Sequence, residues 1–292
     1  MKISRVILAA TFAAATLQAQ TYSNGPQVNT AQPSAAGATK TVAPAKPPGP
    51  QISYNSINTT EPVIAITYDD GPSAKLTPQL LDTLKEKNVK ATFFVLGEMV
   101  AQNPDIVRRA AAEGHEIASH TWDHKALNRL SAEAVASELN KTSQIIFEVT
   151  GKKPTLMRPP YGATNSALNK RINDEFGMKV IIWSVDPLDW KDPGASAVTS
   201  RILAQTHPGA IILSHDIHAG TVKGAPETLD QLKAKGYRFV TVTELLAMDK
   251  GPLPKPPAAP KASAHGPAAK TSATGEATIA PESTQTPSAP KS

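Results

Sequence analysis

The chain has 292 residues, of which 40% are hydrophobic, so it can bury a sizeable core in one large domain or two small ones. Its formal net charge is +5, and its basic residues are spread out instead of forming blocks, which argues against a nucleic-acid partner. The absence of cysteine excludes disulfides, thiolate metal ligands and a nucleophilic thiol. Any metal ion must therefore be held by His, Asp or Glu.

The first residues are typical of a secretory signal. Lys2 and Arg5 precede an apolar stretch from Val6 to Leu17, and a plausible cleavage site ends at Ala19. The stretch is short for a membrane span, and an uncleaved N-terminal anchor is the alternative. We predict a signal peptide over residues 1–19, no stable membrane span after its cleavage, and a protein that is periplasmic, associated with the cell wall or secreted.

Two segments of biased composition flank the rest of the chain. Residues 20–55 are rich in Ala, Pro, Gly, Ser, Thr and Gln, and should form a flexible lead because they cannot bury enough apolar surface. Residues 250–292 contain nine prolines and no aromatic residue, which predicts a disordered tail, either a spacer through cell-wall material or an inert end. Residues 56–249 are left for a single folded domain.

Apolar β-branched runs alternate with amphipathic helical patterns in this domain. The runs predict seven strands, at Val63–Tyr68, Ala91–Leu96, Glu116–Ser119, Thr155–Met157, Val180–Ser184, Ala210–Ser214 and Arg238–Thr241. The amphipathic segments predict helices at Thr77–Lys87, Pro104–Glu113, Ser131–Val149, Asn165–Phe176, Ala195–Gln205, Pro226–Lys235 and Thr243–Met248. The alternation predicts an α/β fold with a largely parallel sheet, either doubly wound or closed into a barrel.

Single residues mark several helix ends. Four glycines stand just past predicted helices, as C-terminal caps do, at positions 114, 151, 177 and 236. Ser131 is a predicted N-cap without a capping box, because Ala134 stands three residues later.

Polar side chains follow the first and third predicted strands. Asp69 and Asp70 end the first strand within TYDDGP, and such neighbouring like charges are costly unless a positive charge, most simply a cation, compensates them. Two aspartates that cap the next helix are the alternative. His120 and His124 follow the third strand, and their spacing predicts two imidazoles on one face of a helical turn, where they can share an ion. Two surface histidines are the alternative.

Three more loops carry polar residues after strands. Arg158-Pro-Pro-Tyr-Gly162 follows the fourth strand, Asp186-Pro-Leu-Asp-Trp190 follows the fifth, and Leu213-Ser-His-Asp216 ends the sixth. Each loop alone could be a structural turn or a packed core residue. Five loops that place Asp, His and Arg at the same end of one sheet are hard to explain as packing. In a barrel, these ends would meet at one mouth.

The motifs TYDDGP, SHTWDH, RPPYG, DPLDW and LSH resemble, in order and separation, those of the NodB-homology polysaccharide deacetylases, carbohydrate esterase family 4. The resemblance covers about Glu61 to Met248 and looks closest to peptidoglycan N-acetylglucosamine deacetylases. It implies a distorted (β/α)7-type barrel that hydrolyses acetyl groups from N-acetylglucosamine polymers or acetylated xylan. It also implies one divalent metal ion, zinc first, with cobalt, nickel or manganese as alternatives.

The resemblance also implies roles for individual residues. Asp70, His120 and His124 would bind the metal ion and leave coordination positions open to water and substrate. Asp69, pointing away from Asp70 because strand neighbours alternate in direction, would be the general base. Arg158 would pair with Asp69 and keep it ionised.

The remaining implied roles concern the leaving group and the acetyl pocket. His215 would be the general acid that protonates the departing sugar amine, and Asp189 would orient it. The Tyr161 backbone N–H would stabilise the oxyanion together with the metal ion. Trp190 and Leu213 would wall the acetyl pocket.

The substrate is the less defined part of the resemblance. The likeness of WSVDPLDWKDP to peptidoglycan N-acetylglucosamine deacetylases favours the wall glycan, with chitin oligosaccharides and acetylxylan as alternatives. A subgroup that acts on muramic acid carries Asn where this chain has Asp70, which argues against that activity. A non-catalytic glycan-binding domain is disfavoured because it needs no acid and base. An esterase on small acyl esters would share every catalytic residue.

Overall fold

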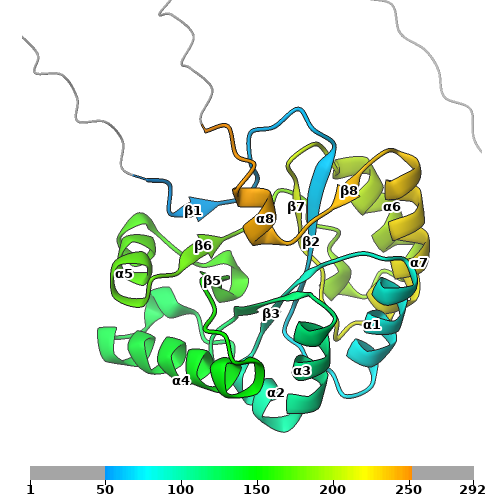
Figure 1. Cartoon of the computed structure of the whole chain (residues 1–292). Coiled ribbons are helices and arrows are strands. Elements are labelled where there is room, and N and C mark those ends of the chain that lie inside the picture. The colour runs from blue at the N-terminus through cyan, green and yellow to red at the C-terminus, as the bar shows by residue number, and fades with distance from the viewer. Residues whose placement is uncertain (1–49, 252–292) are drawn as a thin grey trace, which may run out of the picture. The chain divides into compact units, whose positions relative to one another are not determined.

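The computed structural model describes residues 50–251, and the predicted signal peptide, most of the predicted lead and almost all of the predicted tail lie outside them. The strands are β1 (Ser53–Tyr54), β2 (Val63–Asp69), β3 (Thr92–Val95), β4 (Glu116–Ser119), β5 (Leu156–Met157), β6 (Lys179–Ile181), β7 (Ile211–Ile212) and β8 (Arg238–Phe239). The helices are α1 (Leu76–Glu86), α2 (Gly97–Gln102), α3 (Pro104–Ala112), α4 (Ala132–Thr150), α5 (Ser166–Phe176), α6 (Ala195–Gln205), α7 (Ala219–Ala234) and α8 (Val242–Leu246). All seven predicted strands and all seven predicted helices are present (Figure 1).

The strands form one curled sheet in which every ladder is parallel. Its order is β1-β6-β5-β4-β3-β2-β7, and β8 also pairs with β2. The ring closes where the segment after β6 meets β7, because Val185 bridges Ile212 and the Ser184 N–H donates to the Ile211 carbonyl over 3.0 Å. The fold is therefore the barrel that the resemblance implies, and not an open doubly wound sheet.

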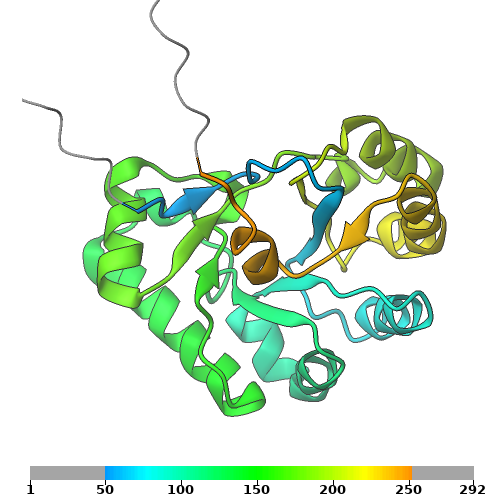
Figure 2. The same cartoon turned by 45° about the horizontal axis from the view of Figure 1, so that its top comes forward.

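Helix α8 covers the end of the barrel where the strands begin. Its Val242 N–H donates to Thr92 Oγ1 at the start of β3, and its Thr243 N–H donates to Glu116 Oε2 at the start of β4. Figures 1 and 2 both show α8 lying across the middle of the ring of strands. Its buried Val242 and Leu245 lie in an interior cluster with residues from each of the strands β2 to β7, among them Ala65, Phe94, Ala118, Leu156, Ile181 and Ile211.

Three parts of the fold differ from the sequence-based prediction. Strand β1 lies in the last residues of the expected flexible lead, and it pairs with β6 over only two residues, which leave no periodic signal. Helix α2 was not predicted, since six residues are too few to show periodicity. Helix α7 begins seven residues before Pro226, because a glycine-containing start is a weak helix signal. One of these glycines, Gly224, lets α7 approach α6, since a Cβ there would lie 3.1 Å from the Ala195 carbonyl oxygen.

The predicted caps are present. Ser131 Oγ accepts the Ala134 N–H over 3.3 Å at the start of α4. Gly151 and Gly177 cap α4 and α5 with φ of 73° and 67°, a left-handed conformation that glycine adopts without a steric penalty.

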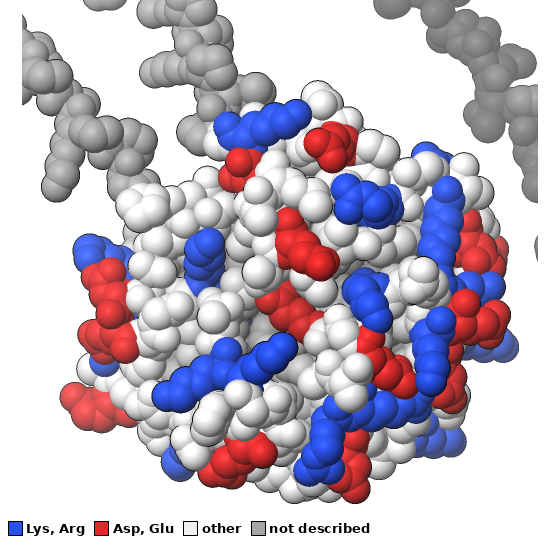
Figure 3. All heavy atoms as spheres, in the orientation of Figure 1, with Lys and Arg blue, Asp and Glu red and all other residues white. Residues whose placement is uncertain are grey.

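The described chain begins and ends at the α8 end of the barrel. The Asn58 N–H donates to Asp249 Oδ1 over 3.0 Å, and Asn58 Nδ2 donates to the Gly251 carbonyl over 2.9 Å. On the face seen in Figure 3, acidic and basic side chains are interspersed. From residue 50 to residue 251, no helix combines the length and the apolar character that crossing a membrane requires.

Helix α8 should contribute to stability through the side chain that it buries inside the barrel. Leu245→Ala should lower the free energy of unfolding by about 2–5 kcal/mol, because it leaves a cavity beside the interior cluster. Phe147→Ala is the control, since it removes a larger side chain that is 42% exposed on α4. Urea denaturation followed by circular dichroism measures both, and an equal loss in the two variants would contradict this view of α8.

Candidate active site

The five motif loops meet at the C-terminal ends of the strands, opposite α8. They surround a cavity of about 530 Å³, which is lined by Asp69, Asp70, His120, His124, Pro159, Tyr161, Trp183, Asp186, Trp190, Leu213 and His215. Eight of the ten predicted site residues are in this lining. The other two, Arg158 and Asp189, are buried directly behind it, where each contacts a lining residue.

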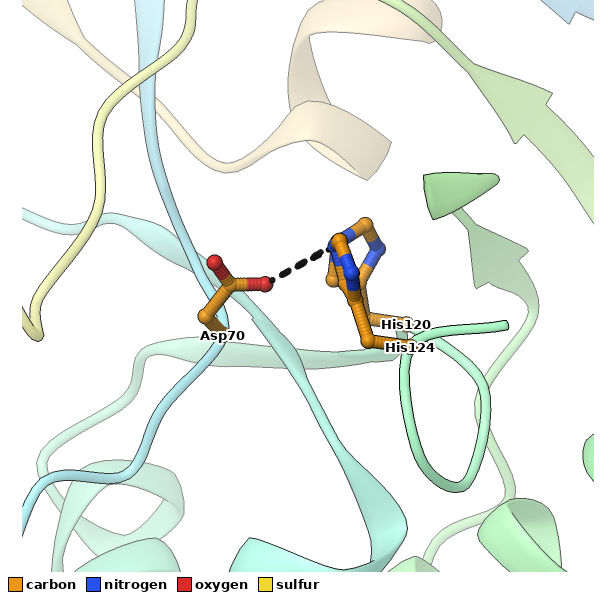
Figure 4. Close-up of side chains that lie close together, drawn as sticks. All are labelled: Asp70, His120 and His124. Carbon is orange, nitrogen blue, oxygen red and sulfur yellow. Dashed lines mark ion pairs between the residues drawn. The ribbon is translucent and has the colours of Figure 1, made fainter. Parts of the chain in front are cut away.

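Asp70, His120 and His124 form a group that can hold one ion (Figure 4). Asp70 Oδ1 lies 3.3 Å from Nε2 of each histidine, and one ligand atom from each residue lies within 4.8 Å of the others. The same Asp70 oxygen is buried and has no hydrogen-bond partner among the described residues. A buried, unpaired carboxylate oxygen that faces two imidazole nitrogens fits a divalent metal ion, which takes these donor types.

Neighbouring groups set the protonation of His120 and Asp70 in the form that binds a metal ion. The Nδ1 of His120 lies 2.7 Å from the Arg158 carbonyl oxygen, so Nδ1 carries the proton and Nε2 keeps its lone pair toward Asp70. Burial would raise the pKa of Asp70, but the nearby imidazoles of His120, His124 and His215 outweigh burial and lower this pKa to about 2. Asp70 is therefore an anion at neutral pH, as a metal ligand needs to be.

The histidines lie on a loop, so the predicted helical turn is wrong. The backbone φ angles of Thr121 and His124 are 71° and 64°, which no right-handed helix contains. The reason is a tertiary contact, since the buried Glu138 of α4 accepts the Trp122 N–H over 2.8 Å and the Asp123 N–H over 3.4 Å. These bonds hold the loop in a bent path that brings both imidazoles to Asp70.

Glu138 was not among the predicted site residues, although its place in the helical pattern of the sequence indicates that it is buried. It lies on the buried face of α4 beside Val135, Leu139 and Thr142. Acidic residues are almost never fully buried unless they are paired, so a carboxylate on the apolar face of a helix indicates a specific partner. Trp183 and Asp186 were also not assigned a role, and both line the cavity.

Asp69 is held by a fully buried arginine. The Asp69 side chain is 3% exposed, the Arg158 side chain is 0% exposed, and their Oδ1 and Nη1 atoms lie 2.6 Å apart. Arg158 Nη2 also donates to the Ile182 carbonyl over 3.0 Å, and its guanidinium carbon stands 4.1 Å from the centre of the Phe94 ring. The pairing expected for Asp69 and Arg158 is therefore present.

The two aspartates do not point apart as strand alternation predicts. Asp70 lies just past the end of β2 with a φ of 73°, so the alternation ends at Asp69. Both carboxylates consequently line the cavity, and Asp69 Oδ2 lies 3.9 Å from His120 Nε2. Asp69 is thus placed beside the ion group without being one of its three members.

His215 faces the ion group from the other side of the cavity. Its Nε2 lies 4.0 Å from Asp70 Oδ2, and its Nδ1 lies 2.8 Å from Asp189 Oδ1. Asp189 is buried, and its second oxygen accepts the His215 backbone N–H over 2.8 Å and the Thr221 hydroxyl over 2.6 Å. Burial would lower the pKa of His215, but the hydrogen bond and charge of Asp189 raise it to about 9. His215 is therefore protonated at neutral pH and can donate a proton.

Two exposed aromatic rings border the cavity, and one buried leucine lines it. Tyr161 is 72% exposed and its backbone has a φ of 62°, in the turn that follows Arg158 and two prolines. Its ring centre lies 4.6 Å from that of His124. Trp190 is 49% exposed, and Leu213 is buried at 3%. The cavity thus offers an apolar wall and an aromatic rim beside the charged groups.

Comparison with known proteins supports a single family. Residues 56–181 match the family model described as polysaccharide deacetylase. The chain is 51% identical over 182 residues to the peptidoglycan-N-acetylglucosamine deacetylase PgdA of Listeria monocytogenes, covering 62% of this chain and 38% of that protein. It is 37% identical over 199 residues to a chitooligosaccharide deacetylase of Rhizobium leguminosarum bv. trifolii, covering 68% of this chain and 89% of that protein.

A solved structure leads to the same family. The crystal structure of the Bc1960 peptidoglycan N-acetylglucosamine deacetylase matches with a TM-score of 0.64 at 37% identity, covering 67% of this chain and 92% of that one. The match to the Listeria protein spans less than two thirds of that protein's own length. With the barrel and the five motif loops at one mouth, these matches show that the chain belongs to the polysaccharide deacetylase family, also called the NodB-homology family or carbohydrate esterase family 4.

Proposed function

We propose that this protein is a metal-dependent deacetylase that hydrolyses N-acetyl groups on N-acetylglucosamine residues of peptidoglycan and releases acetate. The observation that carries the proposal is the arrangement of three groups around one cavity. An ion-binding triad stands between a carboxylate paired with a buried arginine and a histidine paired with a buried aspartate. Amide hydrolysis needs a base for the attacking water and an acid for the leaving amine, and this arrangement supplies both.

The metal ion is proposed to be zinc, held by Asp70, His120 and His124. When bound, such an ion polarises the acetyl carbonyl group and lowers the pKa of a coordinated water molecule. Asp69 accepts the proton of the attacking water as general base. Arg158 fixes the orientation of the Asp69 carboxylate, because its charged Nη1 donates to Asp69 Oδ1 over 2.6 Å.

His215 donates the proton that the departing sugar nitrogen needs. Asp189 orients the imidazole through Nδ1 and keeps it charged, so that Nε2 faces the cavity with a proton. The Tyr161 backbone N–H donates to the carbonyl oxygen as negative charge develops there, a contact worth about 3–4 kcal/mol of barrier in other hydrolases. Trp190 and Leu213 enclose the acetyl methyl group.

The relatives support peptidoglycan as the substrate. The Listeria protein and the Bc1960 structure are named for peptidoglycan N-acetylglucosamine, while the Rhizobium protein is named for chitooligosaccharides. Chitin oligosaccharides and acetylxylan are the alternative substrates. Peptidoglycan lies outside the cytoplasmic membrane, so the proposed substrate is consistent with export by the predicted signal over residues 1–19.

The substrate proposal is tested by acetate release from peptidoglycan, chitopentaose and acetylxylan, each with and without EDTA. We expect the highest kcat/KM on peptidoglycan and no acetate release in EDTA, with activity restored by added zinc. Activity on acetylxylan alone would contradict the substrate. Absence of acetate from all three would favour a non-catalytic glycan-binding domain.

Separate variants distinguish the metal ligand from the acid. Asp70→Ala should reduce bound zinc from about one ion per chain to almost none, because it removes one of three ligands. His215→Ala should retain the ion and lower kcat by about 10²- to 10⁴-fold, because it removes only the proton donor. Metal content by mass spectrometry, measured beside acetate release, separates the two, and loss of zinc in His215→Ala would overturn the role of that residue.

The pH dependence should reveal the influence of Asp189 on His215. A raised His215 pKa keeps the acid protonated to higher pH, so activity should fall only as pH rises through this pKa. Asp189→Asn removes the negative charge, lowers the pKa of His215 and should move the alkaline limb of the kcat/KM profile to lower pH. Thr221→Val removes a neutral hydroxyl from the same carboxylate and serves as the control, with a smaller shift expected. An unchanged alkaline limb in Asp189→Asn would contradict this role.

A further inference from the structure

A second hollow adjoins the catalytic cavity. It has a volume of about 620 Å³ and shares His124 and Tyr161 with the cavity, which places the two side by side. A polysaccharide bound with one acetylated sugar in the cavity must continue over neighbouring surface. The exposed Tyr161 ring, which borders both hollows, offers a flat apolar face against which a second sugar ring can pack.

The lining of this second hollow is basic, and no acidic residue belongs to it. Its charged residues are Lys125 and Arg129, next to Asn128. Lys125 is already compensated, since its Nζ lies 2.6 Å from Asp123 Oδ2 and 3.3 Å from Glu138 Oε1. Arg129 is the positive charge left to meet a ligand.

Arg129 is distinctive among the arginines of the described chain. There are seven between residues 50 and 251, of which five make ion pairs and Arg201 donates to the Pro187 carbonyl. The Arg129 side chain has no such partner among the described residues. Its backbone is nevertheless fixed, because it ends the short helical turn Leu127–Arg129, whose Leu127 is 1% exposed and packs in the core.

We propose that this hollow is a subsite for a sugar that carries a carboxylate and stands next to the sugar being deacetylated, with Arg129 as the group that binds the carboxylate. The proposal rests on the proposed function and extends it to an acidic glycan. A guanidinium group matches a carboxylate with two parallel hydrogen bonds. In peptidoglycan the neighbouring sugar bears a lactyl group and a peptide with carboxylates, whereas chitin bears none. Arg129 therefore favours the former substrate over the latter.

The test compares three substrates of different charge. They are glycan strands with their peptides, strands freed of peptides by an amidase, which exposes the lactyl carboxylate, and neutral chitopentaose. Arg129→Gln should lower the ratio of kcat/KM on acidic strands to kcat/KM on chitopentaose by about two- to fivefold, mainly through KM, as expected for one solvent-exposed ion pair. Arg129→Glu should lower this ratio further. The strand type that shows the larger loss identifies which carboxylate is bound.

Two controls make the result specific. Arg238→Gln removes the same charge at the start of β8, on the opposite end of the barrel, and should leave the ratio unchanged. In 1 M salt, where the screening length falls to about 3 Å, the difference between the wild-type protein and Arg129→Gln should diminish. An unchanged ratio in both Arg129 variants, or an equal fall in Arg238→Gln, would overturn the subsite.

Failure of the proposed function would look different. In that case the wild-type protein would release no acetate from any of the three substrates. The subsite would then be decided by equilibrium binding, since glycan binding needs no turnover. Isothermal titration with amidase-treated strands should still show a two- to fivefold weaker Kd for Arg129→Gln than for Arg238→Gln, and equal Kd values would overturn it.

Discussion

The buried ion pair of Arg158 and Asp69 is the contact on which both the barrel and its site depend. A guanidinium group with no solvent exposure is tolerable only when its charge is paired and its N–H groups are bonded. Arg158 meets this need by bonding to β2 through Thr67 and Asp69 and to the end of β6 through the Ile181 and Ile182 carbonyls. Its own carbonyl orients His120. One side chain and its backbone thus set the positions of Asp69, the proposed base, and of His120, a proposed metal ligand.

Two buried carboxylates also hold other residues of the site in position. Asp189 binds both the ring and the backbone of His215, so the imidazole has little freedom to turn. Glu138 binds two backbone N–H groups of the loop that carries His120 and His124. In each case the carboxylate is shielded from water, so its hydrogen bonds are stronger and its geometry is better defined. The side chains that line the cavity are therefore positioned by buried residues outside the lining as much as by contacts with one another.

Much of the fold and of the site could be predicted from the sequence, because the signals were local. The apolar run of β2 ends at Asp69, and the glycines after α4 and α5 adopt the left-handed conformation expected of caps. The site residues could be found because each lies at or after the end of a strand, and the C-terminal ends of parallel strands meet at one mouth of a barrel. Part of what could not be predicted depends on contacts distant in sequence. Glu138 on α4 bends the loop that carries His120 and His124. Strand β1 forms by pairing with the free edge of β6.

The position of the chain ends has a consequence for how this domain can be combined with others. Asn58 binds Asp249 and Gly251 beside α8, whereas the cavity opens where the strands finish. Residues 50 and 251, where further polypeptide joins the barrel, therefore lie on the side turned away from the cavity. Such a layout allows the same barrel to be built into chains of very different length while the cavity stays open. The match covers 38% of the Listeria relative and 89% of the Rhizobium relative. The Listeria protein therefore has much more polypeptide outside the matched region.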